Sequence, residues 1–488
     1  MSMSAGRYAL TRFTSLAPKG IEAPPNPFTT LRTVNWKQWK FFLIAFWAWT
    51  LDALDFFTVS MTVTSLATEF KVSKKDITWG ITLVLMLRSV GAIIFGVAAD
   101  KWGRKWPFII NNLLFIILEL ITGFTTTYKG FLAVRALFGI AMGGIYGNCA
   151  ATALEDAPPA ARGILSGMMQ QGYAFGYLLA VVFAKALAHD PVHHWRPLFW
   201  FAACPPALLI IWRFFLPETD AFIARQELRR QEEVEGVANV FIKEAKAGFK
   251  KEWLMLLYLV LLMAGFNFMS HGSQDLYPVL LESQLGFSVN KVTVTQVVAN
   301  LGAMTGGTLV GYWSQAFGRR LTIIVACIVG GALVYPYSYT RTGNNIMAAA
   351  FFEQFMVQGA WGVIPIHLME LSPPAMRTFV VGTAYQLGNL VSSASSTIEA
   401  TIGERFPLPD GHDGEKRYDY GKVMAIFMGA VFAYVAILTF VGPEKLGRDL
   451  QKITEDDVVA PKGKLEGDVE HGENVTGEVE KQEVRHAA

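Results

Sequence analysis

Apolar residues in this chain gather into long segments that approach the length of a membrane-spanning helix. Stretches such as 41–49, 81–87 and 254–266 belong to segments near the roughly 20 residues that cross a bilayer. Inside hydrocarbon the backbone must satisfy its own hydrogen bonds, so these segments are predicted to be helices. Charged residues make up only 17% of the chain, whereas soluble domains carry about a quarter. The sequence therefore predicts an all-α membrane protein.

Hydropathy along the chain predicts twelve spanning helices. They cover approximately residues 41–65, 77–99, 107–126, 131–151, 163–187, 197–216, 254–281, 292–313, 320–340, 346–369, 378–402 and 422–442. Cys149, Cys204 and Cys327 all lie in apolar runs, so no disulfide framework is expected. The net charge of +2 gives no reason to expect nucleic acid as a partner. The expected surroundings are a lipid bilayer.

Basic residues follow the even-numbered segments and fill the polar stretch between the sixth and seventh. In the short connections they are Lys101, Arg104, Lys105, Arg162, Arg319, Arg320 and Arg377. Lys and Arg accumulate in cytoplasmic loops of membrane proteins. Both termini and the central stretch are therefore predicted to be cytoplasmic.

This pattern divides the chain into five regions. They are a cytoplasmic N-terminal segment (1–40), a six-helix bundle (41–216), a cytoplasmic central loop (217–253), a second six-helix bundle (254–442) and a cytoplasmic tail (443–488). The tail is acidic and almost without aromatic residues, which is typical of disorder. Its lysines, such as Lys445 and Lys452, are candidates for ubiquitin-mediated turnover, although solvated charge is the ordinary role of such residues.

The two bundles repeat in sequence at a fixed offset of 215 residues. Residues 96–105 (GVAADKWGRK) recur as 311–320 (GYWSQAFGRR), and 155–162 (EDAPPAAR) recur as 370–377 (ELSPPAMR). Gly144, Gly147, Gly167 and Gln171 recur as Gly359, Gly362, Gly382 and Gln386. Several independent matches at one offset indicate duplication of a six-helix unit.

Residues 96–105 resemble the signature loop of the major facilitator superfamily, and the resemblance extends from about residue 40 to 442. It implies two pseudo-symmetric six-helix bundles with a substrate site between them near mid-bilayer. Asp100 can pair with Arg104 or with a neighbouring helix end. The residues expected to latch the cytoplasmic side when the carrier faces outward are Asp100, Arg104, Glu155, Arg162, Arg319, Glu370 and Arg377.

Four ionisable residues inside the first bundle call for an explanation, because each costs at least about 2.5 kcal/mol at the bilayer centre. Asp52 and Asp55 lie three residues apart in the first segment and so on one side of a helix. Arg88 lies deep in the second segment, and Arg135 lies near the outer end of the fourth. Two interpretations stay open. The arginines neutralise Asp52 or Asp55 and hold helices together, or a guanidinium binds a substrate carboxylate.

Arg135 also begins the pattern Arg-x-x-x-Gly-x-x-x-Gly-Gly, which continues to Gly139, Gly143 and Gly144. The pattern resembles a superfamily motif linked to proton coupling and to close helix packing. The resemblance therefore makes Arg135 a candidate for proton coupling.

The seventh segment carries a dense polar stripe. Asn267, Ser270, His271 and Gln274 fall at i, i+3, i+4 and i+7, which is one helical face. Asp275 follows His271 by four residues, so each group can sense the charge of the other. Such a stripe is not expected to face lipid, and it is predicted to line the central cavity.

The stripe also resembles the signature of the fungal lactate and pyruvate:proton symporters of the Jen type, Asn-x-x-Ser/Thr-His-x-Ser/Thr-Gln-Asp-x-x-x-Thr. Every fixed position matches except the last, where Val279 replaces Thr. The resemblance implies that substrate contacts Arg88, Asn267, Ser270, Gln274, Gln386 and Asn389, with Phe175 shaping the pocket. It implies a proton role for His271 and Asp275, and spacing alone leaves Asp52 and Asp55 open as further proton carriers.

The expected function is therefore proton-coupled uptake of short monocarboxylates such as lactate, pyruvate and acetate across the plasma membrane. A proton symporter of dicarboxylates such as succinate or malate stays open, and so does a nutrient receptor that binds without transport. No cofactor, metal or enzymatic activity is expected, because His193 and His194 lack nearby residues that complete a metal site. A monomer is expected.

Overall fold

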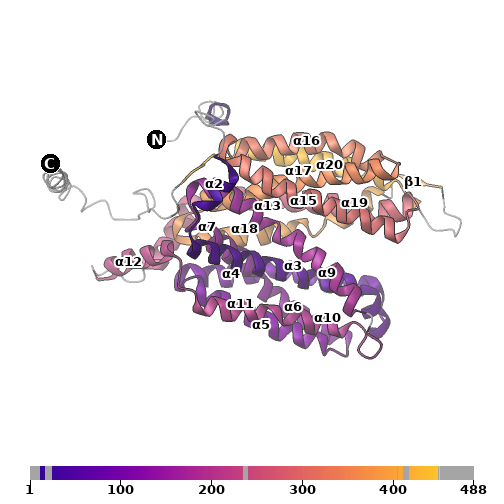
Figure 1. The fold of residues 1–488 in the computed structure, drawn as a ribbon, viewed down its shortest axis with the longest axis horizontal. Coiled ribbons are helices and arrows are strands. Elements are labelled where there is room, and N and C mark those ends of the chain that lie inside the picture. Colours follow the sequence, from indigo (N-terminus) through magenta and orange to yellow (C-terminus); the bar gives the residue numbers. More distant parts are fainter. Residues whose placement is uncertain are drawn as a thin grey trace.

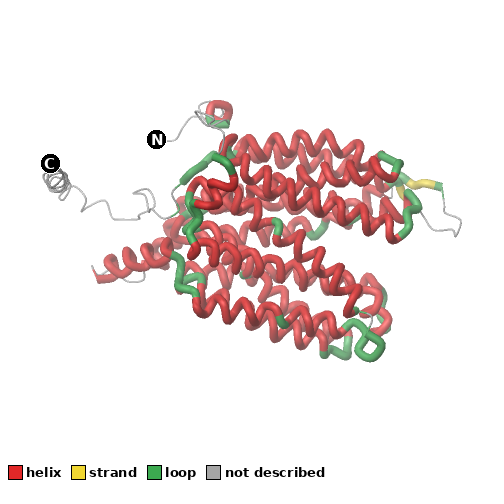
Figure 2. The backbone as a smooth tube through the Cα atoms, in the orientation of Figure 1, coloured by secondary structure: helices red, strands yellow, loops and turns green. Residues whose placement is uncertain are grey.

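The computed structural model describes residues 11–16, 25–188, 190–234, 240–403, 405–409, 417–448 and 450. Helices make up nearly all of this part of the chain (Figure 2). Within it the only strands are the antiparallel pair β1 (Pro407–Leu408) and β2 (Arg417–Tyr418). The predicted all-α fold class is confirmed.

The first bundle consists of consecutive helices that run back and forth between two faces of the molecule. They are α3 (Trp36–Phe70), α4 (Lys74–Trp102), α5 (Lys105–Gly123), α6 (Tyr128–Gly143), α7 (Ile145–Leu154), the 3-10 turn η1 (Pro159–Ala161), α8 (Arg162–Gln170), α9 (Gly172–Leu187), α10 (Arg196–Ala203) and α11 (Pro205–Phe215). The short helix α2 (Pro27–Arg32) precedes them.

The second bundle lies beside the first, as the colour change along the chain makes visible (Figure 1). Its elements are α13 (Val240–Gln274), α14 (Tyr277–Val279), the π turn η2 (Leu280–Gln284), α15 (Val289–Phe317), α16 (Arg319–Tyr339), α17 (Gly343–Leu371), the 3-10 turn η3 (Pro374–Met376), α18 (Arg377–Ser392), α19 (Ser395–Gly403) and α20 (Tyr420–Val441). Helix α12 (Asp220–Val234) connects the bundles.

Each of the twelve predicted segments is helical, either as one helix or as consecutive pieces. The fourth, fifth, sixth, seventh and eleventh segments are each divided, and the first break falls at Gly144 between α6 and α7. In the described part of the chain, eight helical stretches are long and apolar enough to cross a membrane by length and composition. The remaining segments are more polar or more interrupted, because they carry the residues that face the partner bundle.

Both signature loops begin at a glycine that ends a helix. Gly103 ends α4 with φ +96°, and Gly318 ends α15 with φ +86°. Residues with a Cβ rarely adopt this region, so glycine lets the chain reverse within one residue. The arginine that follows each glycine is thereby fixed beside the helix end.

We call the face that carries these two loops the terminal face. Helices α2 and α12 lie at this end of the molecule, whereas β1 lies at the other end (Figure 1). The central stretch predicted as a loop contains α12 and the first turns of α13, which bends at Glu252. The central stretch thus contains helix, and two of its arginines, Arg225 and Arg229, are buried against the terminal face.

Candidate functional site

A cavity of about 300 Å³ lies between the two bundles. Its wall is built by helices α3, α4, α8 and α9 of the first bundle and α13, α17 and α18 of the second. The lining includes Phe56, Phe57, Arg88, Tyr173, Asn267, Ser270, His271, Gln274, Asp275, Trp361, Tyr385 and Asn389. A single guanidinium, several amides, an imidazole and a carboxylate therefore converge in a cavity whose wall also contains several aromatic rings.

Arg88 reaches this cavity from α4, although its side chain is only 2% exposed. Its Nη2 lies 3.3 Å from Oδ2 of Asp52 and 3.1 Å from Sδ of Met142. The guanidinium also lies over the ring of Phe56 at 5.1 Å. One long contact to Asp52 is much weaker than the two parallel bonds of a bidentate pair. The geometry leaves the planar fork of Arg88 able to receive another carboxylate.

The glycine motif that begins at Arg135 positions this part of α4. A Cβ at Gly139 would lie 2.6 Å from the carbonyl oxygen of Val84, and a Cβ at Gly143 would overlap the carbonyl oxygen of Arg88. Glycine at both positions therefore lets α6 approach the backbone of α4 closely. The motif holds Arg88 at a defined depth in the bundle.

The polar stripe of α13 lies along the cavity wall. Nδ2 of Asn267 donates to the carbonyl oxygen of Met263 at 2.8 Å, and Nε2 of Gln274 donates to Oε1 of Gln354 at 3.0 Å. Nδ1 of His271 lies 3.2 Å from Oδ2 of Asp275. The imidazole and the carboxylate are 24% and 34% exposed, so both are accessible from the cavity.

Two residues expected to contact substrate lie elsewhere. Gln386 is fully buried behind Asn389, whose Nδ2 donates to Oε1 of Gln386 at 3.0 Å. Phe175 packs on Phe46 and Trp47 at centroid distances of 6.3 and 5.9 Å. Neither residue lines the cavity. Phe175 packs on α3, and the backbone oxygen of Gln386 accepts a hydrogen bond from Ser89 of the first bundle at 3.1 Å. Gln386 can still orient Asn389.

Arg135 and Asp55 are also remote from the cavity wall. Nη1 of Arg135 donates to Oε2 of Glu119 at 2.8 Å, and its guanidinium lies 3.9 Å from the centroid of Phe138. Asp55 is buried nearby and interacts electrostatically with both groups. The partner of Arg135 is thus a carboxylate of α5 that was not singled out from the sequence. Its signal was a lone Glu in the apolar run 107–126.

Aromatic residues of the cavity were likewise not singled out. Tyr385 stacks on Tyr146 at 4.0 Å and contacts Trp361 at 5.7 Å, so rings from both bundles meet beneath the polar groups. These contacts join α7 to α17 and α18. The aromatic floor separates the cavity from the terminal face.

A second cavity of about 300 Å³ adjoins the first and shares Phe57, Ser60, Tyr173, Gln274, Asp275 and Gln358 with it. Its other walls include Met61, Pro278, Gln296 and Asn300. Gln296 lies near the start of α15, whereas the signature loop lies at the other end of that helix. The combined space therefore extends away from the terminal face.

The terminal face is closed by charged groups of the first signature loop. Nη2 of Arg104 lies 2.8 Å from Oε1 of Glu155 and 3.3 Å from Oδ1 of Asp100. Asp100 also accepts hydrogen bonds from the backbone N–H groups of Thr378 and Phe379, at the beginning of α18. A carboxylate at a helix N-terminus is favoured by the helix dipole. Asp100 thus ties α4 to the second bundle.

Glu155 carries a second bond between the bundles. Nη1 of Arg377 lies 3.7 Å from Oε1 of Glu155. In the second bundle Glu370 pairs with Arg319, whose Nε and Nη2 donate to its two oxygens at 3.1 Å each. Arg319 thus pairs with Glu370 as Arg104 pairs with Glu155 in the first bundle. Arg162 donates to the carbonyl oxygens of Ala157 and Arg448.

Burial alone would raise the pKa of the Glu155 carboxyl, but Arg104 and Arg377 outweigh that effect and hold the pKa below its ordinary value of 4.5. A carboxylate whose pKa is lowered in the folded protein contributes its full stabilisation at any pH above its ordinary pKa. It loses that contribution only as the pH falls through the lowered pKa. The pairing of Glu155 with Arg104 and Arg377 is therefore expected to persist at neutral pH.

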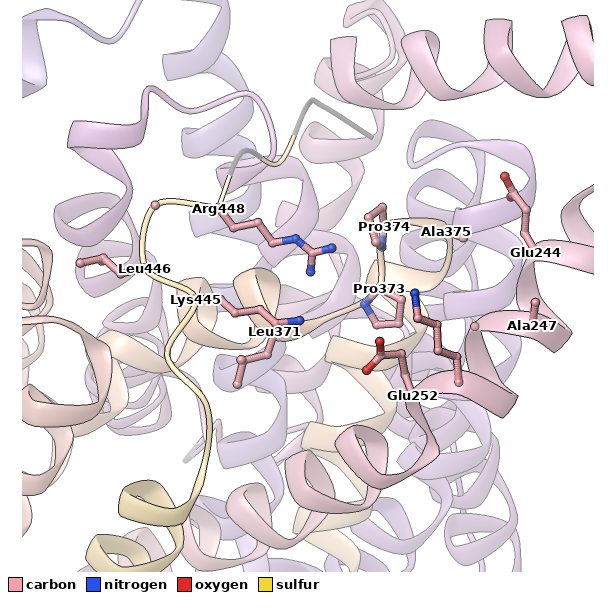
Figure 3. Close-up of a pocket in the computed structure, with 13 residues that line it drawn as sticks. Glu244, Ala247, Glu252, Leu371, Pro373, Pro374, Ala375, Lys445, Leu446 and Arg448 are labelled. Carbon is pink, nitrogen blue, oxygen red and sulfur yellow. The ribbon is translucent and has the colours of Figure 1, made fainter. Parts of the chain in front are cut away.

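The chain that follows α20 reinforces this closure. Nη1 of Arg377 donates to the carbonyl oxygen of Leu450 at 3.0 Å, and Arg448 donates to those of Glu370 and Ser372. Figure 3 shows Arg448 and Lys445 beside Pro373 and Pro374, around a hollow of about 600 Å³. The stretch predicted as a disordered tail thus begins with residues that make defined contacts. Residues 451–488 lie outside the described residues.

His367, Glu370 and Glu444 place possible metal ligand atoms within 4.8 Å of one another. However, Arg319 donates to both oxygens of Glu370, and Glu444 accepts from the backbone N–H of Arg320 at 2.9 Å. The guanidinium charges of Arg319 and Arg320, which lie beside this group, oppose a cation. We assign the group to the closed terminal face.

One prediction concerns the contact of α8 with α15. A Cβ at Gly167 would overlap the carbonyl oxygen of Gly307, so Gly167→Ala must separate the bundles at the terminal face. Overpacking of this kind costs about 1–3 kcal/mol.

Spin labels at the exposed positions Trp102 and Phe317, in a cysteine-free protein, are expected to show a longer distance population in Gly167→Ala. Gly429→Ala is the control, because nothing lies within 4 Å of its Cβ. Identical distance distributions in all three proteins would contradict this role for Gly167.

With this geometry established, the comparisons with known proteins define the class. The profile of the sugar (and other) transporter family matches residues 27–456. The solved proton:xylose symporter XylE shares the fold with a TM-score of 0.68 at 20% identity, over 85% of this chain and 98% of that one. The protein is a membrane transporter with the major facilitator fold, and not an enzyme.

The chain belongs to the sugar (and other) transporter family. It is 44% identical over 458 residues to a carboxylic acid transporter protein homolog of Saccharomyces cerevisiae, which covers 91% of this chain and 74% of the relative. It is 29% identical over 368 residues to the cis,cis-muconate transport protein of Acinetobacter baylyi, with 75% and 87% covered. The yeast match supports the narrower resemblance drawn from the α13 stripe.

Proposed function

We propose that this protein is a proton-coupled symporter that imports short-chain monocarboxylates such as lactate and pyruvate across the plasma membrane. One observation carries the proposal: the only guanidinium at the cavity wall, among the residues described, is that of Arg88, and a single 3.3 Å contact to Asp52 leaves most of its fork unused. Two relatives whose names specify carboxylic acid or muconate transport support an anionic substrate.

The substrate carboxylate binds Arg88, and amide groups of Asn267, Gln274 and Asn389 face the remainder of the molecule. A monocarboxylate brings one negative charge into the cavity, and a proton bound by His271 and Asp275 brings one positive charge. Loading with both therefore leaves the net charge of the site unchanged. Pairing the charges lowers the cost of carrying either across a low-dielectric region.

Alternating access follows from the two faces. In our proposal the terminal face is cytoplasmic, and the structure corresponds to a carrier that is closed inward with its cavity extending outward. Binding of anion and proton lets the bundles rock, which separates Asp100 from α18 and Glu155 from Arg377. Gradients of one pH unit supply about 1.4 kcal/mol per proton, or roughly tenfold accumulation.

Uptake of radiolabelled lactate, pyruvate and succinate into proteoliposomes tests the proposal. With an acidic exterior, lactate and pyruvate are expected to accumulate above their external concentrations, and an uncoupler is expected to abolish the accumulation. Because one proton balances one monocarboxylate, this uptake is expected to be electroneutral. Accumulation of succinate alone would favour a dicarboxylate carrier. Binding without flux would instead identify a receptor and contradict the proposal.

A further inference from the structure

Two carboxyl groups of the second bundle are buried without a hydrogen bond or an ion pair in the described part of the chain. Glu353 of α17 and Glu399 of α19 are each 0% exposed. All four of their carboxyl oxygens lack a hydrogen-bond partner within the described part of the chain, and neither group forms an ion pair there. An ionised carboxylate without donors costs several kcal/mol or more in such surroundings. Both groups are therefore held as neutral carboxylic acids.

The two acids share a phenol as a neighbour. Tyr337 of α16 interacts electrostatically with both, and its hydroxyl donates to the carbonyl oxygen of Ser273 at 2.5 Å. Tyr277 stacks on Tyr337 with ring centroids 4.0 Å apart, on the side of Glu353. Because the Tyr337 hydroxyl already donates its hydrogen, its oxygen can accept a hydrogen from a protonated acid.

Two lysine side chains of the surrounding helices lie over aromatic rings and not beside the two acids. Lys291 of α15 lies over the ring of Phe287 at 3.6 Å, and Lys422 of α20 lies over that of Phe406 at 4.0 Å. The titratable groups that face the two acids are the tyrosines of α14 and α16 together with Asp275, which interacts electrostatically with Glu399. A carboxylate in this environment gains no stabilisation from a fixed positive charge.

Groups that interact with both acids nevertheless line the open space. Tyr337 and Gln354 line the second cavity together with Gln274 and Asp275. Gln354 follows Glu353 on α17 and accepts a hydrogen bond from Gln274 of the α13 stripe. Glu399 is linked to the same wall through its interaction with Asp275. The wall of the second cavity therefore carries polar groups that interact electrostatically with both acids.

We infer that Glu353 and Glu399 form a second proton-binding site of this carrier, distinct from His271 and Asp275 and loaded from the cavity through Tyr337 and the Gln274–Gln354 pair. The inference rests on the proposed function insofar as the bound proton serves symport. The site takes up its proton while the cavity opens away from the terminal face. It releases the proton to water as a hydronium ion when the bundles rock and water reaches the acids from the other side, leaving a carboxylate.

The amide variants Glu353→Gln and Glu399→Gln test this inference, because glutamine keeps the shape and cannot release the proton. Glu282→Gln is the matched control, since Glu282 is an exposed residue of η2 in the same bundle. Infrared difference spectra of the purified proteins report the carbonyl band of protonated carboxylic acids. We expect this band to lose intensity in each amide variant and to be unchanged in the control.

Transport measurements in proteoliposomes give the second result. Each amide variant is expected to lower lactate accumulation driven by one pH unit from roughly tenfold to near equality, while lactate exchange without a gradient stays within about twofold of wild type because Arg88 is intact. Tyr337→Phe, which removes only the hydroxyl, is expected to slow accumulation and spare exchange. This variant serves if an amide variant fails to fold.

Unchanged infrared bands in both amide variants would overturn the inference, and so would full accumulation in the amide variants or, if they do not fold, in Tyr337→Phe. The proposed function fails separately if the wild-type protein exchanges no carboxylate. In that event, loss of the acid bands in the amide variants would still establish the protonated site.

Discussion

Lactate uptake is expected to fall at least tenfold when Arg88 is replaced by lysine. The ammonium group keeps the charge beside Asp52 but lacks the planar fork that binds a carboxylate through two parallel bonds. Hydrogen bonds to charged groups contribute about 1.5–3 kcal/mol each, which corresponds to roughly 10- to 100-fold in the apparent substrate constant. The measurement is the initial rate of labelled uptake against lactate concentration in proteoliposomes.

Arg341→Lys is the control for this variant, because Arg341 is exposed and remote from the cavity. Its uptake is expected to match that of wild type. If Arg88→Lys also transports lactate with an unchanged rate and constant, Arg88 is a structural partner of Asp52 and not a substrate ligand.

The second large effect is expected for His271→Ala. Removing the imidazole leaves Asp275 without its neighbour at 3.2 Å and removes the exposed group whose ordinary pKa lies nearest physiological pH. Accumulation that follows an imposed pH gradient should therefore be lost, while exchange of labelled for unlabelled lactate at equal pH is retained. The measurement compares these two fluxes in the same proteoliposomes.

His193→Ala provides the matched control, since His193 is exposed in the connection before α10. It should accumulate lactate as wild type does. Accumulation that still tracks the pH gradient in His271→Ala would exclude an essential proton role for that histidine and leave the buried acids of α17 and α19 as the principal candidates.

The internal repeat explains why so much of the terminal face could be predicted. Gly103 and Gly318 occupy equivalent places in the two signature loops, and both adopt positive φ at a helix end. The arginine after each pairs with a glutamate of the motif that follows, Arg104 with Glu155 and Arg319 with Glu370. The two pairs have the same separation of 51 residues, because both partners of each pair belong to one bundle.

Contacts between bundles could not be predicted in this way. Asp100 caps α18, and Arg377 reaches Glu155, across separations of more than 200 residues that no periodicity records. The sequence repeat also did not reveal that Glu218 and Glu444 are equivalent. They accept hydrogen bonds from the backbone N–H groups of Lys105 and Arg320, respectively. These glutamates follow connections of different length, so they fall outside the fixed offset.

Within the site, the sequence predicted the α13 stripe and Arg88 because helical spacing and the cost of buried charge are local properties. Phe175 and Gln386 do not line the cavity, and residue type alone does not say which side of a helix faces it. Glu119, Glu353 and Glu399 carried the same signal as Asp52, an acid inside an apolar run, and the same cost argument applied to every segment would have found them.

The most direct test of the central claim is the ratio of affinities for lactate and for its neutral amide, lactamide, measured by calorimetric titration of purified protein. If the Arg88 guanidinium receives an incoming carboxylate, wild type should prefer lactate by roughly 10- to 100-fold, and Arg88→Lys should lose most of that preference. Equal affinities for the two ligands in wild type, or a preference unchanged in Arg88→Lys, would contradict the account.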